Sequence, residues 1–101
     1  MTTLHLIIHL HDTLTGEAAI WRTTETRQET ETREEQVGLI RYMWSDGNYG
    51  CDCNRRLFLD RAQGREVEVG AYPCSERRVV VDCIMDDETG ELLYRDEVKA
   101  K

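Results

Sequence analysis

The sequence has no apolar run that approaches the roughly 18 residues needed to cross a membrane as a helix. The segment Met1–His5 also lacks the positive charge and the long apolar stretch of a secretory signal peptide. We therefore expect a cytoplasmic protein that has no membrane partner. In that compartment its four cysteines are expected as thiols or metal ligands rather than as a disulfide framework.

The motifs of the common catalytic sites are absent as well. The sequence contains no glycine-rich phosphate loop, no serine-centred nucleophile elbow and no His-Glu-x-x-His pattern. Cys51 and Cys53 have Arg55 and Arg56 nearby, which favours a thiolate, but no base accompanies them in the local sequence. We expect a non-enzymatic protein, with a cysteine-dependent enzyme as the most distant alternative.

Positive charge is scarce. The chain has 13 lysine and arginine residues against 20 aspartate and glutamate residues, which gives a net charge of -7. A phosphate backbone is repelled by such a surface, so direct binding to nucleic acid is disfavoured. The acidity suits a protein partner with a basic groove. The alternative is that the charge only keeps a small protein in solution.

The chain length of 101 residues fits a single domain, residues 1–101. Apolar residues at every second position predict a half-buried strand over residues 3–11, with Leu4, Leu6, Ile8 and Leu10 facing inward. The turn segment Asp12–Glu17 predicts a hairpin into a strand at residues 18–22. The related segment Asp86–Glu91 predicts a second hairpin between residues 78–85 and 92–95.

The remaining segments are less regular. Residues 24–35 are polar and rich in threonine, which predicts an exposed β-arm or loop rather than a helix. The apolar run Val37–Trp44 predicts a central strand. Residues 56–61 are expected as a strand or one helical turn, and residues 66–69 as an edge strand. The fold class is therefore mainly β, or α+β with one short helix, with about six or seven antiparallel strands.

The most specialised segment extends from Asp46 to Arg56. It combines glycines, asparagines, aromatic residues and a Cys-x-Cys pair, which predicts a rigid bend at the end of an interior strand. We expect this loop to form the binding site, through Trp44, Asp46, Asn48, Tyr49, Asp52, Asn54 and Arg55.

The cysteines and histidines raise the question of a metal. A tetrahedral zinc site would use Cys51, Cys53, Cys74 and Cys83, but their spacing lacks the usual Cys-x2-Cys knuckle. The alternatives are that these residues are reduced buried thiols or, less in keeping with the compartment, form a disulfide. His5, His9 and His11 share one face of the first strand and form a second candidate cation site, or a solvated surface. The expected cofactor is none, or zinc.

The segment Tyr42–Arg55 resembles a motif of small uncharacterised proteins encoded by tailed bacteriophages and prophages, Trp-x-Asp/Glu-Gly-Asn-x-x-Cys-Asp-Cys-Asn-Arg. The resemblance covers about a quarter of the chain and implies a phage accessory protein in the host cytoplasm. We expect it to bind a host or phage protein through its acidic surface and the loop, for example as an inhibitor of host defence. The alternative is a small structural zinc protein, and self-association into a homo-oligomer stays open.

Overall fold

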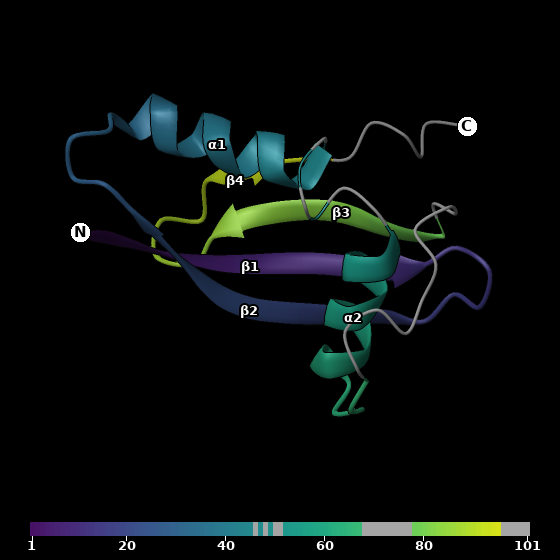
Figure 1. Ribbon diagram of the computed structural model, residues 1–101. Coiled ribbons are helices and arrows are strands. Elements are labelled where there is room, and N and C mark those ends of the chain that lie inside the picture. Colours follow the sequence, from purple (N-terminus) through teal and green to yellow (C-terminus); the bar gives the residue numbers. More distant parts are fainter. Residues whose placement is uncertain (46, 48, 50–51, 68–77, 96–101) are drawn as a thin grey trace.

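The computed structural model describes residues 1–45, 47, 49, 52–67 and 78–95 (Figure 1). In chain order the elements are β1 (Thr2–Asp12), β2 (Ala18–Arg27), α1 (Arg33–Ser45), α2 (Asp52–Ala62), β3 (Val79–Asp86) and β4 (Leu92–Tyr94). The strands form one antiparallel sheet in the order β2-β1-β3-β4. The predicted β-rich, α+β class is confirmed. The described residues form four strands, however, rather than six or seven, and two helices rather than one.

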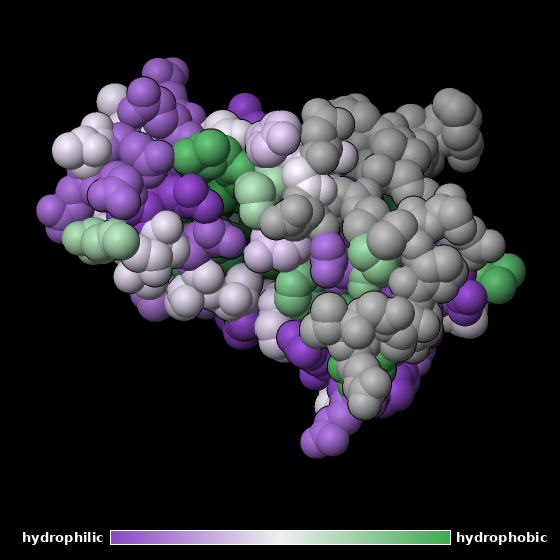
Figure 2. All heavy atoms as spheres, in the orientation of Figure 1, coloured by the Kyte–Doolittle hydropathy of each residue, from purple (hydrophilic) through white to green (hydrophobic). Residues whose placement is uncertain are grey.

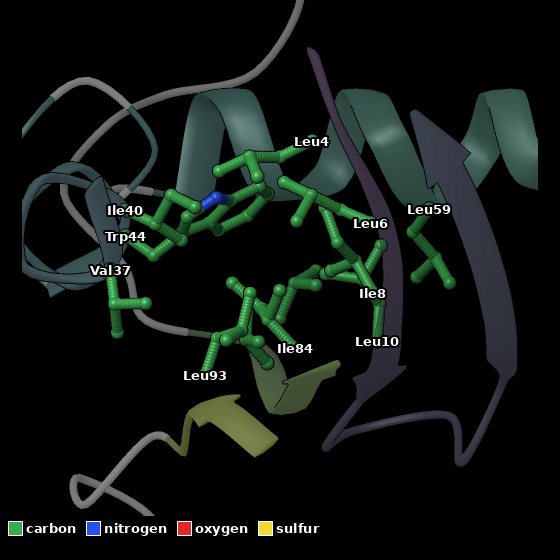
Figure 3. Packing of buried hydrophobic residues seen from close by; sticks show 12 residues of the cluster. Leu4, Leu6, Ile8, Leu10, Val37, Ile40, Trp44, Leu59, Ile84 and Leu93 are labelled. Carbon is green, nitrogen blue, oxygen red and sulfur yellow. The ribbon is translucent and has the colours of Figure 1, made fainter. Parts of the chain in front are cut away.

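The hydrophobic core lies between the two helices and one face of the sheet (Figure 3). β1 runs through its middle, and its alternate residues Leu4, Leu6, Ile8 and Leu10 are all buried, as the alternation predicted. The other elements add the remaining members of the cluster, Val37, Ile40, Trp44, Leu59, Val79, Val81, Ile84 and Leu93. Burying one such side chain contributes roughly 1.5–3 kcal/mol relative to leaving it exposed, so this cluster is the main stabilising feature.

The two predicted hairpins are confirmed, and their turns have the same geometry. In the first, Asp12 Oδ1 accepts hydrogen bonds from the backbone amides two and three residues later, at 2.8 and 3.2 Å. In the second, Asp86 Oδ1 does the same at 2.8 and 3.1 Å. Each turn ends at a glycine with positive φ, 80° at Gly16 and 77° at Gly90, where other residues would be strained.

Each turn aspartate is also paired with arginine from elsewhere in the chain. Asp12 is fully buried; Arg78 Nε lies 2.9 Å from its carboxylate, and Arg56 of α2 donates a second hydrogen bond to it. Asp86 is 4% exposed and accepts a 2.6 Å hydrogen bond from Arg33 of α1. The second hairpin is thereby tied to α1 and the first to α2.

The ion pairs determine the charge state of both turn carboxylates. Burial by itself would raise the pKa of Asp12, but hydrogen bonds from Arg78, from two backbone amides and from Arg56 lower it well below its ordinary value. The pKa of Asp86 is lowered for the same reasons: burial opposes ionisation, while Arg33 and two amides more than offset it. Both groups therefore stay ionised at neutral pH.

The predicted central strand Val37–Trp44 is wrong, because this run forms most of helix α1. The buried residues Val37, Ile40 and Trp44 are spaced by three and four positions, which places them on one helical face toward the core. An apolar run of eight residues fits a buried strand or a helix segment equally well, and here packing against the sheet selects the helix.

The polar segment 24–35 is divided between two elements. Its first part continues β2 to Arg27, as the β-arm predicted, whereas α1 begins at Arg33. The start of α1 is a capping box: the amide of Glu35 donates to Thr32 Oγ1 at 3.1 Å, and the amide of Thr32 donates to Glu35 Oε1 at 2.7 Å. Figure 2 shows hydrophilic residues gathered at this end of the molecule.

The segment after α1 also differs from its prediction. Residues 56–61 belong to helix α2, which begins at Asp52 and is 11 residues long, rather than to a strand or a single turn. The predicted bend Asp46–Arg56 therefore follows a helix, not an interior strand, and its last residues are helical. Of the expected edge strand 66–69, residues 66 and 67 form no strand and the rest lies outside the described residues. No helix among the described residues has the length and apolar character to cross a membrane.

Candidate functional site: an aromatic pocket beside the free edge of β2

Four of the seven aromatic residues of the chain meet at one pocket of about 110 Å³ on the helix-covered side of the sheet. They are Trp21, Trp44, Tyr49 and Phe58. The ring centroids of Trp44 and Tyr49 are 4.8 Å apart, and those of Tyr49 and Phe58 are 5.4 Å apart with the rings nearly perpendicular. Trp21 stacks on Phe58 at 5.6 Å. Both tryptophans of the chain thus belong to this site.

Three separate elements bring these rings together. Trp21 lies opposite Ile8 in the β1–β2 ladder and therefore faces the same side of the sheet as the core. Trp44 comes from the last helical turn of α1 and is 3% exposed, while half-buried Phe58 comes from the middle of α2. Because α2 packs across β2, Phe58 meets Trp21.

A buried arginine fixes the wall formed by Trp44 and Tyr49. Arg55 is fully buried, and its guanidinium donates hydrogen bonds to the backbone oxygens of Tyr49 at 2.9 Å and Trp44 at 2.5 Å. It also contacts the backbone oxygen of Val79 at 3.4 Å. The first turn of α2 therefore holds the end of α1 and the position of Tyr49 relative to the sheet.

Gly47 is needed where the chain leaves α1. Its amide donates to the backbone oxygen of Tyr42 at 2.8 Å, the long 6→1 bond that often closes a helix. A Cβ atom at Gly47 would lie 2.8 Å from the backbone Cα of Met43, closer than side chains normally approach. Only glycine allows this close approach, so Gly47 is part of what positions the following ring, Tyr49.

One carboxylate lines the pocket with the rings. Glu25 of β2 accepts a 2.7 Å hydrogen bond on Oε1 from Arg27 Nη2, and the side chains of the two residues are 21% and 19% exposed. Arg27 Nε is buried and has no hydrogen-bond partner among the described residues. Glu25 Oε1 is therefore paired, whereas the neighbouring Arg27 Nε is removed from water without a described hydrogen-bond partner.

The free edge of the sheet runs along the same strand. The amide of Asp12 donates to the backbone oxygen of Glu17, so odd-numbered residues of β2 bond to β1 and even-numbered ones point their backbone groups outward. Within the described part of the chain, Gln63 Nε2 contacts the oxygen of Ala18 at 3.4 Å, and nothing pairs with the outward groups of Ile20, Arg22, Thr24 and Thr26. The β1–β2 register has no shift over the length of the strand.

The structure separates the predicted binding residues. Trp44 and Arg55 are buried; Trp44 lines the pocket, and Arg55 holds its wall in place. Tyr49 lines the pocket directly. Asn54 is half-buried in α2, and Asp52 is the first residue of that helix. The predicted contributions of Asp46, Asn48 and the side chain of Asp52 lie outside the described residues.

The described cysteines are not gathered at one place. Cys53 lies in α2, on the helix-covered side, whereas Cys83 of β3 pairs with His9 on the opposite face. Burial raises the pKa of the Cys83 thiol, and the neighbouring Asp82 carboxylate raises it further. Cys51 and Cys74 lie outside the described residues. This arrangement does not support one zinc site that holds both Cys53 and Cys83.

The histidine face also carries no metal site in the described part of the chain, where no three His, Cys, Asp or Glu side chains are placed to share an ion. His11 Nδ1 lies 3.0 Å from Asp82 Oδ2, and His5 Nε2 lies 4.0 Å from Glu88. Cys53 cannot share an ion with these histidines, because the sheet lies between them.

Sequence reasoning missed Trp21, Glu25 and Phe58 as site residues. Trp21 and Glu25 occupy odd-numbered positions of β2, opposite Ile8 and Leu4 of the core face, so the alternation of β1 contained a usable signal. Phe58 gave no such signal, because its position depends on where α2 crosses the sheet. Comparison of the chain with family models, with curated proteins and with solved structures found no match.

Proposed function

We propose that this protein is a non-enzymatic binding protein that holds an extended segment of a partner protein along the free edge of β2. One side chain of that segment enters the aromatic pocket. The observation that carries the proposal is the adjacency of the two features on a single strand. Trp21, Thr23, Thr24 and Glu25 line the pocket, while no described residue pairs with the outward backbone groups of the even-numbered residues of this strand segment.

The geometry of strand addition supports this arrangement. An extended segment that pairs with a sheet edge gains main-chain hydrogen bonds, and its alternate side chains point to one face. Every second side chain of a segment paired with β2 therefore points to the helix-covered face, where the pocket lies. The edge is 10 residues long and has neither proline nor a bulge, two devices that otherwise prevent such pairing.

The size of the pocket supports a side chain rather than a metabolite. Sites for small molecules are usually clefts of at least about 300 Å³. The aromatic pocket measures about 110 Å³, enough for the end of one side chain. An interaction through the edge and one anchor is also consistent with a non-enzymatic role.

The partner class follows from charge and from the phage resemblance. The net charge of -7 favours a partner with a basic surface. The motif in Tyr42–Arg55 supports a phage accessory protein, so the proposed partner is a host or phage protein, and inhibition of a host defence factor is the specific role. Tyr49 of the predicted Asp46–Arg56 loop takes part through the pocket wall.

Substitution of Thr24 tests the proposal. Its amide points outward, so Thr24→Pro removes an edge donor without breaking a bond to β1, and the ring blocks an added strand. The matched control is Thr24→Val, which keeps the donor. We expect tagged wild-type protein and Thr24→Val to retain the same protein from host lysate, and Thr24→Pro to lose it. A partner retained equally by folded Thr24→Pro, or no partner retained by the wild type, would contradict the proposal.

A further inference from the structure

We infer that the side chain accepted by the aromatic pocket is a cation, and that an arginine guanidinium fits it best. The inference rests on the proposed function, because it names the chemistry recognised at the same site. It depends on three properties of the pocket: the orientation of its rings, the state of its carboxylate and its volume.

The rings present more than one face to the pocket. Trp44, Tyr49 and Phe58 are mutual neighbours, with ring planes inclined by 38° to 69°, so they cannot form a single flat stack. All three residues line the pocket, so inclined rings rather than one flat surface border it. The face of an aromatic ring is electronegative and attracts a cation within about 6 Å of the ring centre. A cation held in this pocket lies among three aromatic side chains.

The carboxylate of Glu25 makes an uncharged occupant unfavourable. Its Oε1 is bound by Arg27, but no described residue donates a hydrogen bond to its Oε2. Glu25 lines the pocket, so an apolar side chain there would displace water from its carboxylate and give nothing in return, which is costly for an ionised group. A guanidinium instead supplies N–H donors and an opposite charge, so it compensates for the lost water.

The volume of the pocket and the net charge of the chain further limit which side chain fits the site. A dry cavity of about 150 Å³ holds one benzene molecule. The pocket of about 110 Å³ is smaller than that, which favours the small flat end of an arginine over a large indole group. The planar guanidinium also stacks on aromatic faces better than an ammonium does. The net charge of -7 attracts cations to the protein and repels anionic groups.

The chain offers a direct readout. It contains two tryptophans, both in the pocket, so the two indole N–H signals in an NMR spectrum report on this site alone. The probes are N-acetyl-arginine amide, its uncharged isostere N-acetyl-citrulline amide, and N-acetyl-lysine amide. We expect the arginine probe to shift both indole signals saturably, with at least about tenfold higher affinity than citrulline, and lysine to fall between them.

Two variants test whether the preference for the arginine probe depends on the Glu25 carboxylate. Glu25→Gln should weaken the arginine probe about threefold to tenfold and leave the citrulline probe unchanged. Glu34→Gln is the matched control, because it removes one charge from an exposed position on α1. If Glu25→Gln fails to fold, the comparison of arginine with citrulline on the wild type still decides the question.

The results separate this inference from the proposed function. Equal affinities for arginine and citrulline, or no shift of either indole signal with any probe, would overturn cation recognition. If a partner is nonetheless lost in Thr24→Pro, binding along the β2 edge stands and only the cation is wrong. If the pocket binds the arginine probe selectively but no partner is captured, cation recognition by the pocket stands and the proposed function is contradicted.

Discussion

Replacement of Asp12 by asparagine should destabilise this fold more than the same replacement at Asp86. The two aspartates have equivalent places in turns of the same geometry, so the local turn bonds cancel in the comparison. Their arginine partners differ. Asp12 is fully buried with two arginines against its carboxylate, whereas Asp86 is 4% exposed and its partner Arg33 is 41% exposed.

The magnitude follows from what each substitution leaves behind. Removing one partner of a buried ion pair costs about 3–5 kcal/mol, because a charge is left without compensation. At Asp12 the lower end applies, since Arg56 keeps Glu17 and Asp60 at 3.7 Å. At Asp86 the loss is that of a charged hydrogen bond, about 1.5–3 kcal/mol, and the lower end applies there because Arg33 keeps Glu91 at 2.9 Å. We therefore expect Asp12→Asn to cost about 3 kcal/mol and Asp86→Asn about 1.5 kcal/mol.

Urea denaturation at pH 7, followed by the fluorescence of the two tryptophans, measures both losses. With a slope of about 1.5 kcal/mol per molar urea, the midpoint should fall by about 2 M for Asp12→Asn and about 1 M for Asp86→Asn. Equal losses, or a larger loss at Asp86, would refute the reasoning that buried arginine contacts distinguish the two turns.

The same variants carry a pH dependence. Both carboxyls have a folded-state pKa below the ordinary value, so their stabilisation is fully present above the unfolded pKa and is lost as the pH falls toward the folded one. The wild type should therefore lose stability below about pH 4. The stability difference between wild type and Asp12→Asn should shrink between pH 7 and pH 3. A difference that stays constant over this range would show that the Asp12 carboxyl does not titrate with folding.

Two further pairs of substitutions test the ends of α1. Gly47→Ala should lower the free energy of unfolding by about 1–3 kcal/mol because its Cβ would meet the backbone of Met43 at 2.8 Å, whereas Gly38→Ala, where nothing lies within 4 Å, should raise it by up to about 1 kcal/mol. Thermal melts of both variants check the opposite signs, and two shifts of the same sign would contradict this account. Thr32→Ala should cost about 1 kcal/mol through loss of the helix cap, against no change for exposed Thr30→Ala; equal melting temperatures would exclude a contribution from the capping box.

The errors of prediction concern segments whose pattern fits two structures. Val37–Trp44 is apolar at nearly every position, so a central strand and a buried helix were both consistent with it. The capping pair Thr32 and Glu35 lies just before the run and favours the helix, although the threonine-rich composition of residues 24–35 favours a polar arm. Because residues 37–44 are helical, the bend that follows them has other neighbours than predicted. Arg55 points inward and donates hydrogen bonds to backbone oxygens at the end of α1 and the start of β3.

The candidate site combines residues of the specialised segment with residues from distant parts of the chain. Tyr49 and Trp44 were expected at the site because they lie in the specialised segment, and both do form its wall. Trp44 is 3% exposed, whereas Tyr49 is half-buried. Trp21 and Phe58 come from distant parts of the chain, and their contact depends on how α2 crosses β2.

The sequence by itself determined the elements whose signals are local. The alternation of β1 and the two turns with Gly16 and Gly90 depend on side-chain period and backbone dihedral preference, which act within a few residues. Only the tertiary structure decided that Val37–Trp44 is helical, that Arg55 is buried and that four aromatic rings share one pocket. These outcomes depend on which surfaces pack together, because the same apolar or cationic side chain is stable in several local conformations until a neighbour from another part of the chain covers it.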